Sequence, residues 1–318
     1  MEQLVAHGGN STRNIPVDLI VEILSLLPVK SIIRFQSVSK QWFSIIRSKD
    51  LWETFLTRSK TRPHLLVVLE IFPPGKLLLF SVPEHKEDSN DKTPTANSRQ
   101  DMTRSKDDYY HLSSLPVNGF VSFTHIFYST IFWNSITVCN PITRQTVKLP
   151  DIGNNGRKVY PFLGYDPVED QYKVLCVMMY TDRLDNKPEH YVCTVSSSEK
   201  QEWRNIENTT VDYDGYVSQG ICIDGAIYYG VGKSNIVKFN VRFENMQMIN
   251  APKESNISRT CNSTLVNYNG RLGGVDFDYS KQEMNLWILE DVEKQEWSRK
   301  AFKYPCEWKG FPVLLDSN

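Results

Sequence analysis

Residues 15–35 read IPVDLIVEILSLLPVKSIIRF, and residues 38–46 continue as VSKQWFSII. In the first stretch, large apolar residues recur every three or four positions, as they do along one side of an α-helix. Pro16 suits the first turn of a helix, where its missing N–H is not needed, and Pro28 ends that helix. Two further apolar groups follow, so the sequence predicts three short helices over residues 15–60.

This helical module is too small to hide its own apolar side chains. A chain of about 45 residues buries only a low fraction of its surface when it folds. The module nevertheless holds Phe35, Trp42, Trp52 and Phe55 besides its leucines and isoleucines. We therefore expect part of its apolar surface to face a partner.

The remainder of the chain has a different pattern. After residue 62, short apolar runs alternate with Gly, Asn, Asp and Pro, which is typical of strands joined by tight turns. Asn118-Gly119, Asp224-Gly225 and Asn269-Gly270 open three weakly similar units, and such pairs supply the positive φ angles of hairpin turns. The second and third units begin 45 residues apart, at Ile223 and Tyr268, a spacing typical of one propeller blade.

These patterns predict a multidomain protein of α plus all-β class. We expect a flexible segment at 1–14, the helical module at 15–60 and a β-rich domain at 61–318, with a polar loop at 83–108. A β-propeller of five or six blades is the predicted form of the β-rich domain, and a large β-sandwich is the alternative.

Charge and composition narrow the classes of partner. The formal net charge is −1 and Lys/Arg-rich runs are absent, which argues against nucleic acid. The most apolar run, residues 65–72, contains Glu70 and is too short to cross a bilayer, so no membrane partner is expected. The first residues do not resemble a secretory signal, and the six cysteines form no CxxC pair. We expect an intracellular protein of the cytoplasm, the nucleus or both.

Catalytic and cofactor motifs are missing from the sequence. The six histidines are dispersed, and G-x-S-x-G, phosphate-loop and dinucleotide patterns do not occur. Asp276 and Asp278 alternate along one predicted strand, where surface solvation or a turn accounts for them. Cys139 and Cys193 lie in strand patterns and are predicted to be buried small hydrophobes rather than nucleophiles. The sequence therefore predicts no enzyme activity, no metal and no cofactor.

Two tryptophans occupy matching places in the weak repeat. Trp203 and Trp297 each follow Gln-Glu. We expect both to pack in the core of their repeats rather than to bind a ligand.

Two segments carry a family resemblance. The run from Ile15 to Phe35, with Leu-Pro-Val-Lys-Ser after the first helix, and the following Val38-Ser39-Lys40-Gln41-Trp42 closely resemble the plant form of the F-box. The remainder resembles the F-box-associated domain of a large plant family. Its supporting phrases are Cys139 to Gln145, Leu163 to Pro167 and Gln201 to Arg204.

The resemblance implies a substrate-recognition subunit of an SCF-type (Skp-cullin-F-box) E3 ubiquitin ligase. The F-box would bind a Skp-type adaptor and, through it, a cullin, while the β-rich domain would bind an unknown target protein and promote its ubiquitination. Arg34 and Lys40 would lie near the rim of the adaptor contact. The adaptor-binding residues carried over by position are Pro16, Leu19, Ile23, Leu26, Leu27, Pro28, Ile32, Val38 and Trp42.

Two alternatives stay open at this point. The chain could be a non-degradative F-box scaffold, or its aromatic-rich β domain could bind a glycan or another small ligand. Each adaptor-binding residue could also simply pack inside the helical module.

Overall fold

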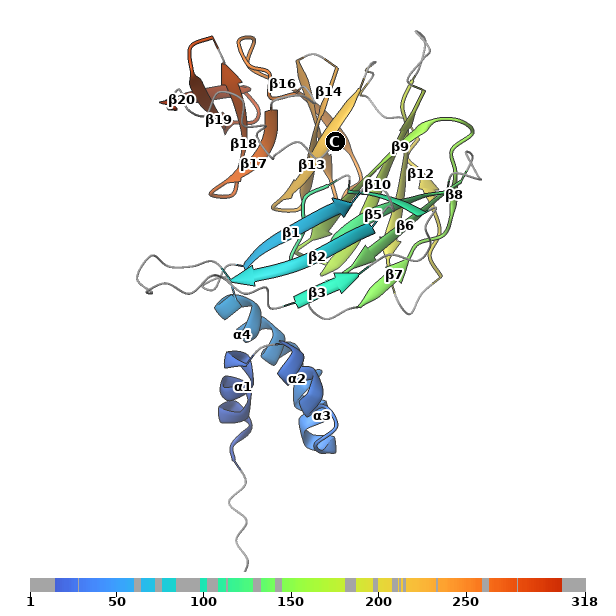
Figure 1. The fold of residues 1–318 in the computed structure, drawn as a ribbon, viewed down its shortest axis with the longest axis vertical. Coiled ribbons are helices and arrows are strands. Elements are labelled where there is room, and N and C mark those ends of the chain that lie inside the picture. The colour runs from blue at the N-terminus through green and yellow to red at the C-terminus, as the bar shows by residue number, and fades with distance from the viewer. Residues whose placement is uncertain are drawn as a thin grey trace, which may run out of the picture. The chain divides into compact units, whose positions relative to one another are not determined.

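The computed structural model describes residues 15–27, 29–59, 64–71, 76–83, 98–101, 108–112, 114–127, 133–140, 145–180, 187–196, 200–207, 211, 213, 216–232, 234–258, 263–278 and 280–304. Helices occupy the first part of the described chain and strands the rest (Figure 1). The chain divides into two compact units, residues 1–67 with 80–99 and residues 68–79 with 100–318.

The described N-terminal residues form four helices, where the sequence predicts three. They are α1 (Val17–Leu26), α2 (Val29–Phe35), α3 (Lys40–Ile46) and α4 (Lys49–Ser59). The extra break has a local cause: α3 ends at Arg47, and the Ser48 hydroxyl accepts a hydrogen bond from the Leu51 N–H at 3.4 Å, which starts α4. Ser39 starts α3 in the same way, accepting from the Trp42 N–H at 3.2 Å.

A small apolar core holds the four helices together. The Trp42 ring packs on this core and lies 5.3 Å from the Phe35 ring, centroid to centroid. The Trp52 indole N–H donates to the Ile46 carbonyl at 2.8 Å, which joins α4 to α3. The fully or nearly buried members of the core are Ile20, Leu24, Ile32, Ile45, Ile46 and Leu51.

The described strands form five antiparallel sheets. The first is β1 (His64–Ile71), β2 (Lys76–Pro83) and β3 (Ser98–Asp101), and the second is β4 (Asp108–Leu112), β5 (Val121–Phe127), β6 (Trp133–Cys139) and β7 (Thr146–Lys148), with β8 (Ile152–Gly153) beside β6. The third is β9 (Lys158–Asp166), β10 (Gln171–Met179), β11 (Glu189–Val195) and β12 (Arg204–Asn205). The fourth is β13 (Val217–Ile223), β14 (Ala226–Val231), β15 (Asn235–Asn240) and β16 (Met246–Asn250), and the fifth is β17 (Ser263–Tyr268), β18 (Arg271–Asp278), β19 (Glu283–Asp291) and β20 (Glu296–Lys303).

The last three sheets are meanders in which each strand pairs with its neighbour in sequence. Strand β9 lies beside β5 and β13, and β13 lies beside β17 (Figure 1). Strand β3 falls inside the stretch 83–108, where the sequence predicts only a polar loop. The remainder of that stretch lies largely outside the described residues.

Two kinds of turn connect the strands. The predicted hairpin pairs are confirmed, because Asp224 and Gly225 have φ angles of 44° and 75°, and Asn269 and Gly270 have φ angles of 52° and 82°. In the second kind, an Asp or Asn side chain accepts hydrogen bonds from the N–H groups two and three residues later. The turns of this kind begin at Asp166, Asn240, Asp278 and Asp291 and end on positive-φ residues, which are Asp170, Glu244, Gln282 and Gln295.

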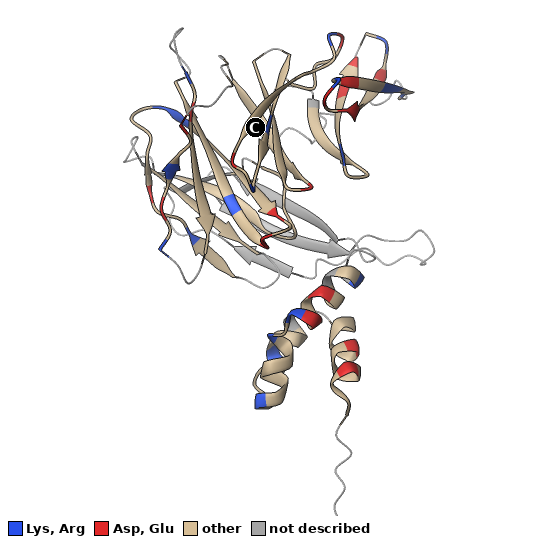
Figure 2. Ribbon diagram, turned by 180° about the vertical axis from the view of Figure 1, so that it is seen from behind, with Lys and Arg blue, Asp and Glu red and all other residues tan. Residues whose placement is uncertain are grey.

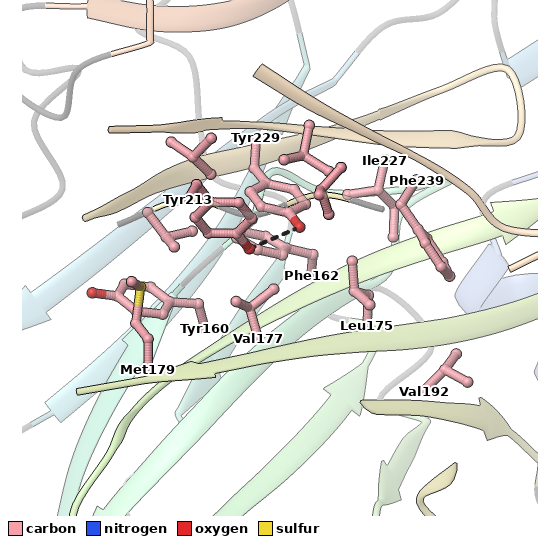
Figure 3. Close-up of a cluster of buried hydrophobic side chains, with 14 of the residues drawn as sticks. Tyr160, Phe162, Leu175, Val177, Met179, Val192, Tyr213, Ile227, Tyr229 and Phe239 are labelled. Atoms are coloured by element: carbon pink, nitrogen blue, oxygen red, sulfur yellow. Dashed lines mark hydrogen bonds between the residues drawn. The ribbon is translucent and has the colours of Figure 1, made fainter. Parts of the chain in front are cut away.

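The largest buried cluster lies between the sheets β9–β12 and β13–β16 (Figure 3). At its centre the Phe162 ring stacks on the Tyr229 ring, with centroids 4.8 Å apart. The Tyr229 hydroxyl hydrogen-bonds the Tyr213 hydroxyl at 3.2 Å, and the latter lies 2.9 Å from His190 Nε2. Burial lowers the pKa of His190 to about 4, so this imidazole is neutral at pH 7.

The repeated tryptophans pack as expected and also make a matching hydrogen bond. Trp203 and Trp297 are half-buried against core clusters. The Trp203 indole N–H donates to the Pro150 carbonyl at 2.8 Å, and that of Trp297 donates to the Asn250 carbonyl at 3.0 Å. Pro150 lies between β7 and β8 and Trp203 just before β12, while Asn250 ends β16 and Trp297 lies on β20, so each indole connects two successive sheets or their adjoining segments.

The two alternating aspartates have different environments. Asp278 begins a turn, as predicted. Surface solvation is the wrong explanation for Asp276, which is buried and accepts hydrogen bonds from the Asn256 N–H at 2.8 Å, the Asn285 side-chain amide at 2.9 Å and the Trp287 indole at 3.2 Å. The full set of donors lets a carboxylate lie inside the sheet without a catalytic role.

Candidate functional site

Exposed apolar side chains gather on the described helices. Eight of the eleven large hydrophobic residues that stand exposed among the described residues belong to the first 43 positions. Scattered exposed leucines are ordinary on protein surfaces, but a concentration of this kind marks a contact surface. The eight residues are Ile15, Val17, Leu19, Ile23, Leu26, Ile33, Val38 and Phe43.

Helix α1 is apolar on two sides that lie about 100° apart round the helix. Ile20 and Leu24 point into the core and are 5% and 0% exposed. Leu19, Ile23 and Leu26, spaced by four and three residues, form a second stripe that is 50%, 49% and 48% exposed. We call these three residues the α1 stripe. Ile20 and Leu24 are the buried core residues of α1 among its apolar side chains, whereas the α1 stripe stands half exposed.

The other predicted adaptor-binding residues divide into three groups. Pro16 and Val38 are exposed, Val38 in the turn that precedes α3. Leu27 and Trp42 are half-buried and pack against the core. Ile32 is 0% exposed, so in the free chain it is a packing residue. Pro28 lies outside the described residues.

Four exposed apolar residues of this region were not among the predicted contacts. Ile15 and Val17 precede or begin α1, and Ile33 and Phe43 lie on α2 and α3. Ile32 and Ile33 are adjacent and therefore about 100° apart round the helix, and Ile33 lies on the exposed side while Ile32 packs in the core. Phe43 likewise stands next to Trp42, which takes the inward position.

Charges flank the exposed apolar residues unevenly. Helix α1 carries Asp18 and Glu22, whereas the described side chains of α2 and α3 include Arg34 and Lys40 and no acidic residue (Figure 2). The predicted rim residues Arg34 and Lys40 are exposed. A mixed polar border round an apolar centre is the usual composition of a protein–protein interface.

A second set of contacts fixes α1 against α4. The Arg58 guanidinium donates to the Ser25 hydroxyl at 2.7 Å and to the Glu22 carbonyl at 3.2 Å, and it pairs with the Glu22 carboxylate at 3.1 Å. These contacts approach α1 from the side that also carries Val21, away from the α1 stripe. The stripe is thus presented by a helix whose orientation is already set.

The β-rich part offers no comparable chemical site among its described residues. Cys139 and Cys193 are buried, as predicted, and burial raises the pKa of their thiols to about 12 and about 11, which keeps them protonated and unreactive. Within the described ranges, no three His, Cys, Asp or Glu side chains gather closely enough to hold a metal ion. None of the described helices is long and apolar enough to cross a bilayer.

Comparison with known proteins gives two matching families. An F-box domain model matches residues 13–54, and a model described as "F-box associated beta propeller domain" matches residues 64–315. F-box protein At3g49450 of Arabidopsis thaliana is 34% identical over 318 residues, covering 96% of this chain and 77% of that protein. Putative F-box protein At1g47790 of the same plant is 36% identical over 298 residues, covering 92% and 72%. Neither matched model describes a catalytic family.

Solved structures resemble the chain only weakly. The GH93 alpha-L-arabinofuranosidase of Fusarium graminearum aligns with a TM-score of 0.37 and 8% identity, over 74% of this chain and 69% of that one. A TM-score this low carries no information about fold or function.

Proposed function

Because the chain belongs to the F-box proteins that carry an F-box associated beta propeller domain, we propose that it is the substrate-recognition subunit of an SCF-type E3 ubiquitin ligase. Members of this family are generally substrate receptors of such ligases. The helical unit binds a Skp-type adaptor and, through it, a cullin. The β-rich part holds the target protein, and the chain itself does no chemistry. It acts by keeping a target lysine close to the conjugating enzyme, which raises the local concentration of that lysine.

The α1 stripe is the observation that carries the adaptor contact. Leu19, Ile23 and Leu26 are half exposed in the free chain, and their burial against an apolar partner is favourable by the hydrophobic effect. Val38 and Phe43 add exposed apolar area beyond α1. Ile20 and Leu24 make the core contacts of α1, while the three residues of the stripe stay about half exposed.

The β-rich part fits a propeller that presents its turns to a target. The propeller closure is suggested by the family description and agrees with successive antiparallel meanders of four strands. Turns and loops at the ends of such sheets are where binding residues concentrate. The target itself is not named by any feature of the chain.

Co-purification with a recombinant plant Skp-type adaptor and cullin tests the proposal. The wild-type chain should be recovered with both proteins, and a variant carrying Leu19→Asp and Ile23→Asp should be recovered with neither, because an unpaired carboxylate buried at the contact costs several kcal/mol. Phe302→Asp is the matched control, since Phe302 is also a half-exposed apolar residue but lies on β20. Circular dichroism checks that all three chains are folded.

Two results would contradict the proposal. Failure of the folded wild type to bind the adaptor would remove the docking step. Binding of the adaptor and cullin, without ubiquitin conjugates on any co-purified protein when the conjugating enzyme is added, would instead favour a non-degradative scaffold.

A further inference from the structure

Apolar and aromatic side chains form a row along one end of the β-rich part. Val168 and Phe243 are 68% and 69% exposed, and no other described large hydrophobic residue of the chain is as exposed as these two. Phe120, Tyr165 and Tyr172 are half-buried: Phe120 comes just before β5, Tyr165 lies near the end of β9, and Tyr172 lies opposite it near the start of β10. We call these five residues the apolar rim.

Contacts between neighbouring rings make the aromatic part of the rim continuous. The Phe120 ring lies 4.8 Å from the Tyr172 ring, and the Tyr172 ring lies 4.8 Å from the Tyr165 ring, centroid to centroid. The Tyr165 hydroxyl donates to the Asp170 carboxylate at 2.7 Å, across the turn that carries Val168.

The same turn continues the rim into the next sheet. Glu169 pairs with Arg242 at 3.7 Å, and Arg242 is the immediate neighbour of Phe243. The apolar rim therefore runs across the ends of three sheets, β4–β8, β9–β12 and β13–β16.

The two exposed tips are held rigidly by their turns. The Asp166 carboxylate accepts from the Val168 N–H at 2.9 Å, and the Asn240 side chain accepts from the Phe243 N–H at 2.9 Å. A contact surface that is already ordered loses less conformational entropy when a partner binds.

A partly buried charge network supports the Phe243 turn. The Lys173 ammonium, itself 7% exposed, donates to the Val241 carbonyl at 3.0 Å and to the Glu244 carboxylate at 2.8 Å. The Arg204 guanidinium donates two hydrogen bonds of 2.8 Å to the same Glu244 carboxylate. The turn is thereby tied to both β10 and β12 of the neighbouring sheet.

Two of the carboxylates that border the rim are paired with cations of the chain. Glu169 is matched by Arg242, and Glu244 is matched by Lys173 and Arg204, while Asp170 accepts a hydrogen bond from the Tyr165 hydroxyl. A strongly charged partner would have to disrupt these pairs. The fit is therefore to an uncharged, apolar partner, and the row-like shape favours an extended segment.

We propose that the apolar rim binds an extended, uncharged segment of the target protein through its large aliphatic or aromatic side chains. This inference rests on the proposed function for the identity of the partner as a target, but the rim itself is independent of the F-box. Phe243 and Val168 are the anchors, and the ring row from Tyr165 to Phe120 extends the contact.

An array of short synthetic peptides tests the partner chemistry. The full chain is applied to equal numbers of uncharged apolar, acidic and basic peptides, and the strongest binder is then titrated in solution by fluorescence anisotropy. We expect the uncharged apolar class to bind. A double variant, Val168→Ser with Phe243→Ser, should weaken that binding at least about tenfold, as truncation of interface anchors does. Phe302→Ser is the control and should change it less than about twofold.

Other outcomes overturn the inference. Preference for acidic or basic peptides, binding by no class, or equal weakening by Phe302→Ser would each do so. Light scattering during size exclusion tests one further outcome that would contradict the inference. If the wild-type chain is a dimer and the double variant is a monomer, the rim binds a second copy of the chain. Adaptor binding is measured on the same preparations, so a failure of the F-box contact is separable from a failure of the rim.

Discussion

Replacing Leu19, Ile23 and Leu26 together by alanine removes the α1 stripe without touching the core. Alanine has the highest helix propensity, so α1 itself should be retained. The three side chains point away from Ile20 and Leu24, which keep the helix on its core. The substitution therefore separates the adaptor contact from the fold of the helical unit.

The expected size of the effect follows from the exposed area. Burying a Leu or Ile side chain completely is favourable by about 2 kcal/mol. Each residue of the α1 stripe is half exposed, so about 1 kcal/mol per residue remains to be gained on binding. The triple variant should lose about 3 kcal/mol, which corresponds to a Kd for the adaptor raised about 100-fold.

Isothermal titration calorimetry of each chain with a recombinant Skp-type adaptor measures this change. Leu24→Ala is the contrasting variant: its side chain is fully buried, so it should lower the free energy of unfolding by about 3 kcal/mol. Phe302→Ala controls for the loss of a half-exposed apolar side chain elsewhere. A triple variant that is folded and binds within about threefold of wild type would refute the assignment of the stripe.

Three further predictions concern the β-rich part. The folded-state pKa of His190 is lowered to about 4, against about 6.5 in the unfolded chain, so the unfolded chain takes up a proton first as the pH falls. The free energy of unfolding should therefore fall by roughly 3 kcal/mol between pH 7 and pH 4 on account of this residue. Urea titrations of His190→Gln should lack this part of the pH dependence, and an equal pH dependence in the variant would disprove the assignment. Gly270 has a φ of +82° with open space around its Cα, so Gly270→Ala should cost about 1–2 kcal/mol of backbone strain, whereas Asn269→Gly should stay within about 0.5 kcal/mol in the same assay. Trp297→Phe should lose about 1 kcal/mol with the indole hydrogen bond to the Asn250 carbonyl; an unchanged Tm in calorimetry would show that this bond contributes nothing.

The helical part was predictable where local spacing decides the structure. The apolar repeat through Leu24 and the two prolines were sufficient to predict α1. The division into four helices was missed because it depends on the hydroxyl of a single residue, Ser48, which accepts from the Leu51 N–H. Which apolar residues face outward could be predicted only as a class, since the choice between Ile32 and Ile33 is made by tertiary packing.

The hairpins of the β-rich part were predictable only in part. Asp-Gly and Asn-Gly pairs indicate tight turns because glycine adopts a positive φ angle without steric strain. The turns at Asp166 and Asn240 end on Asp170 and Glu244 instead. In each turn the positive-φ residue follows the Asp or Asn by four positions, and this spacing was not used as a turn signal. That spacing recurs in the sequence and would have located these hairpins.

Buried polar groups were beyond local prediction. Asp276 was assigned to the surface because its donors come from Asn256, Asn285 and Trp287, which only the folded sheet brings together. The same holds for Lys173, whose acceptors lie on a turn of another sheet.

The indole bonds between successive sheets also set an order for the growing chain. The donor to the Pro150 carbonyl lies 53 residues further along the chain, and the donor to the Asn250 carbonyl lies 47 residues further along. During synthesis these two acceptors therefore stay without their indole donor until most of the following sheet has been made. We expect neighbour-to-neighbour coupling of this kind to let the array fold by propagation from one sheet to the next, from the N-terminal side onward. A chain halted shortly after residue 250 would keep the Pro150 bond and lack the second, and would so report how far propagation had gone.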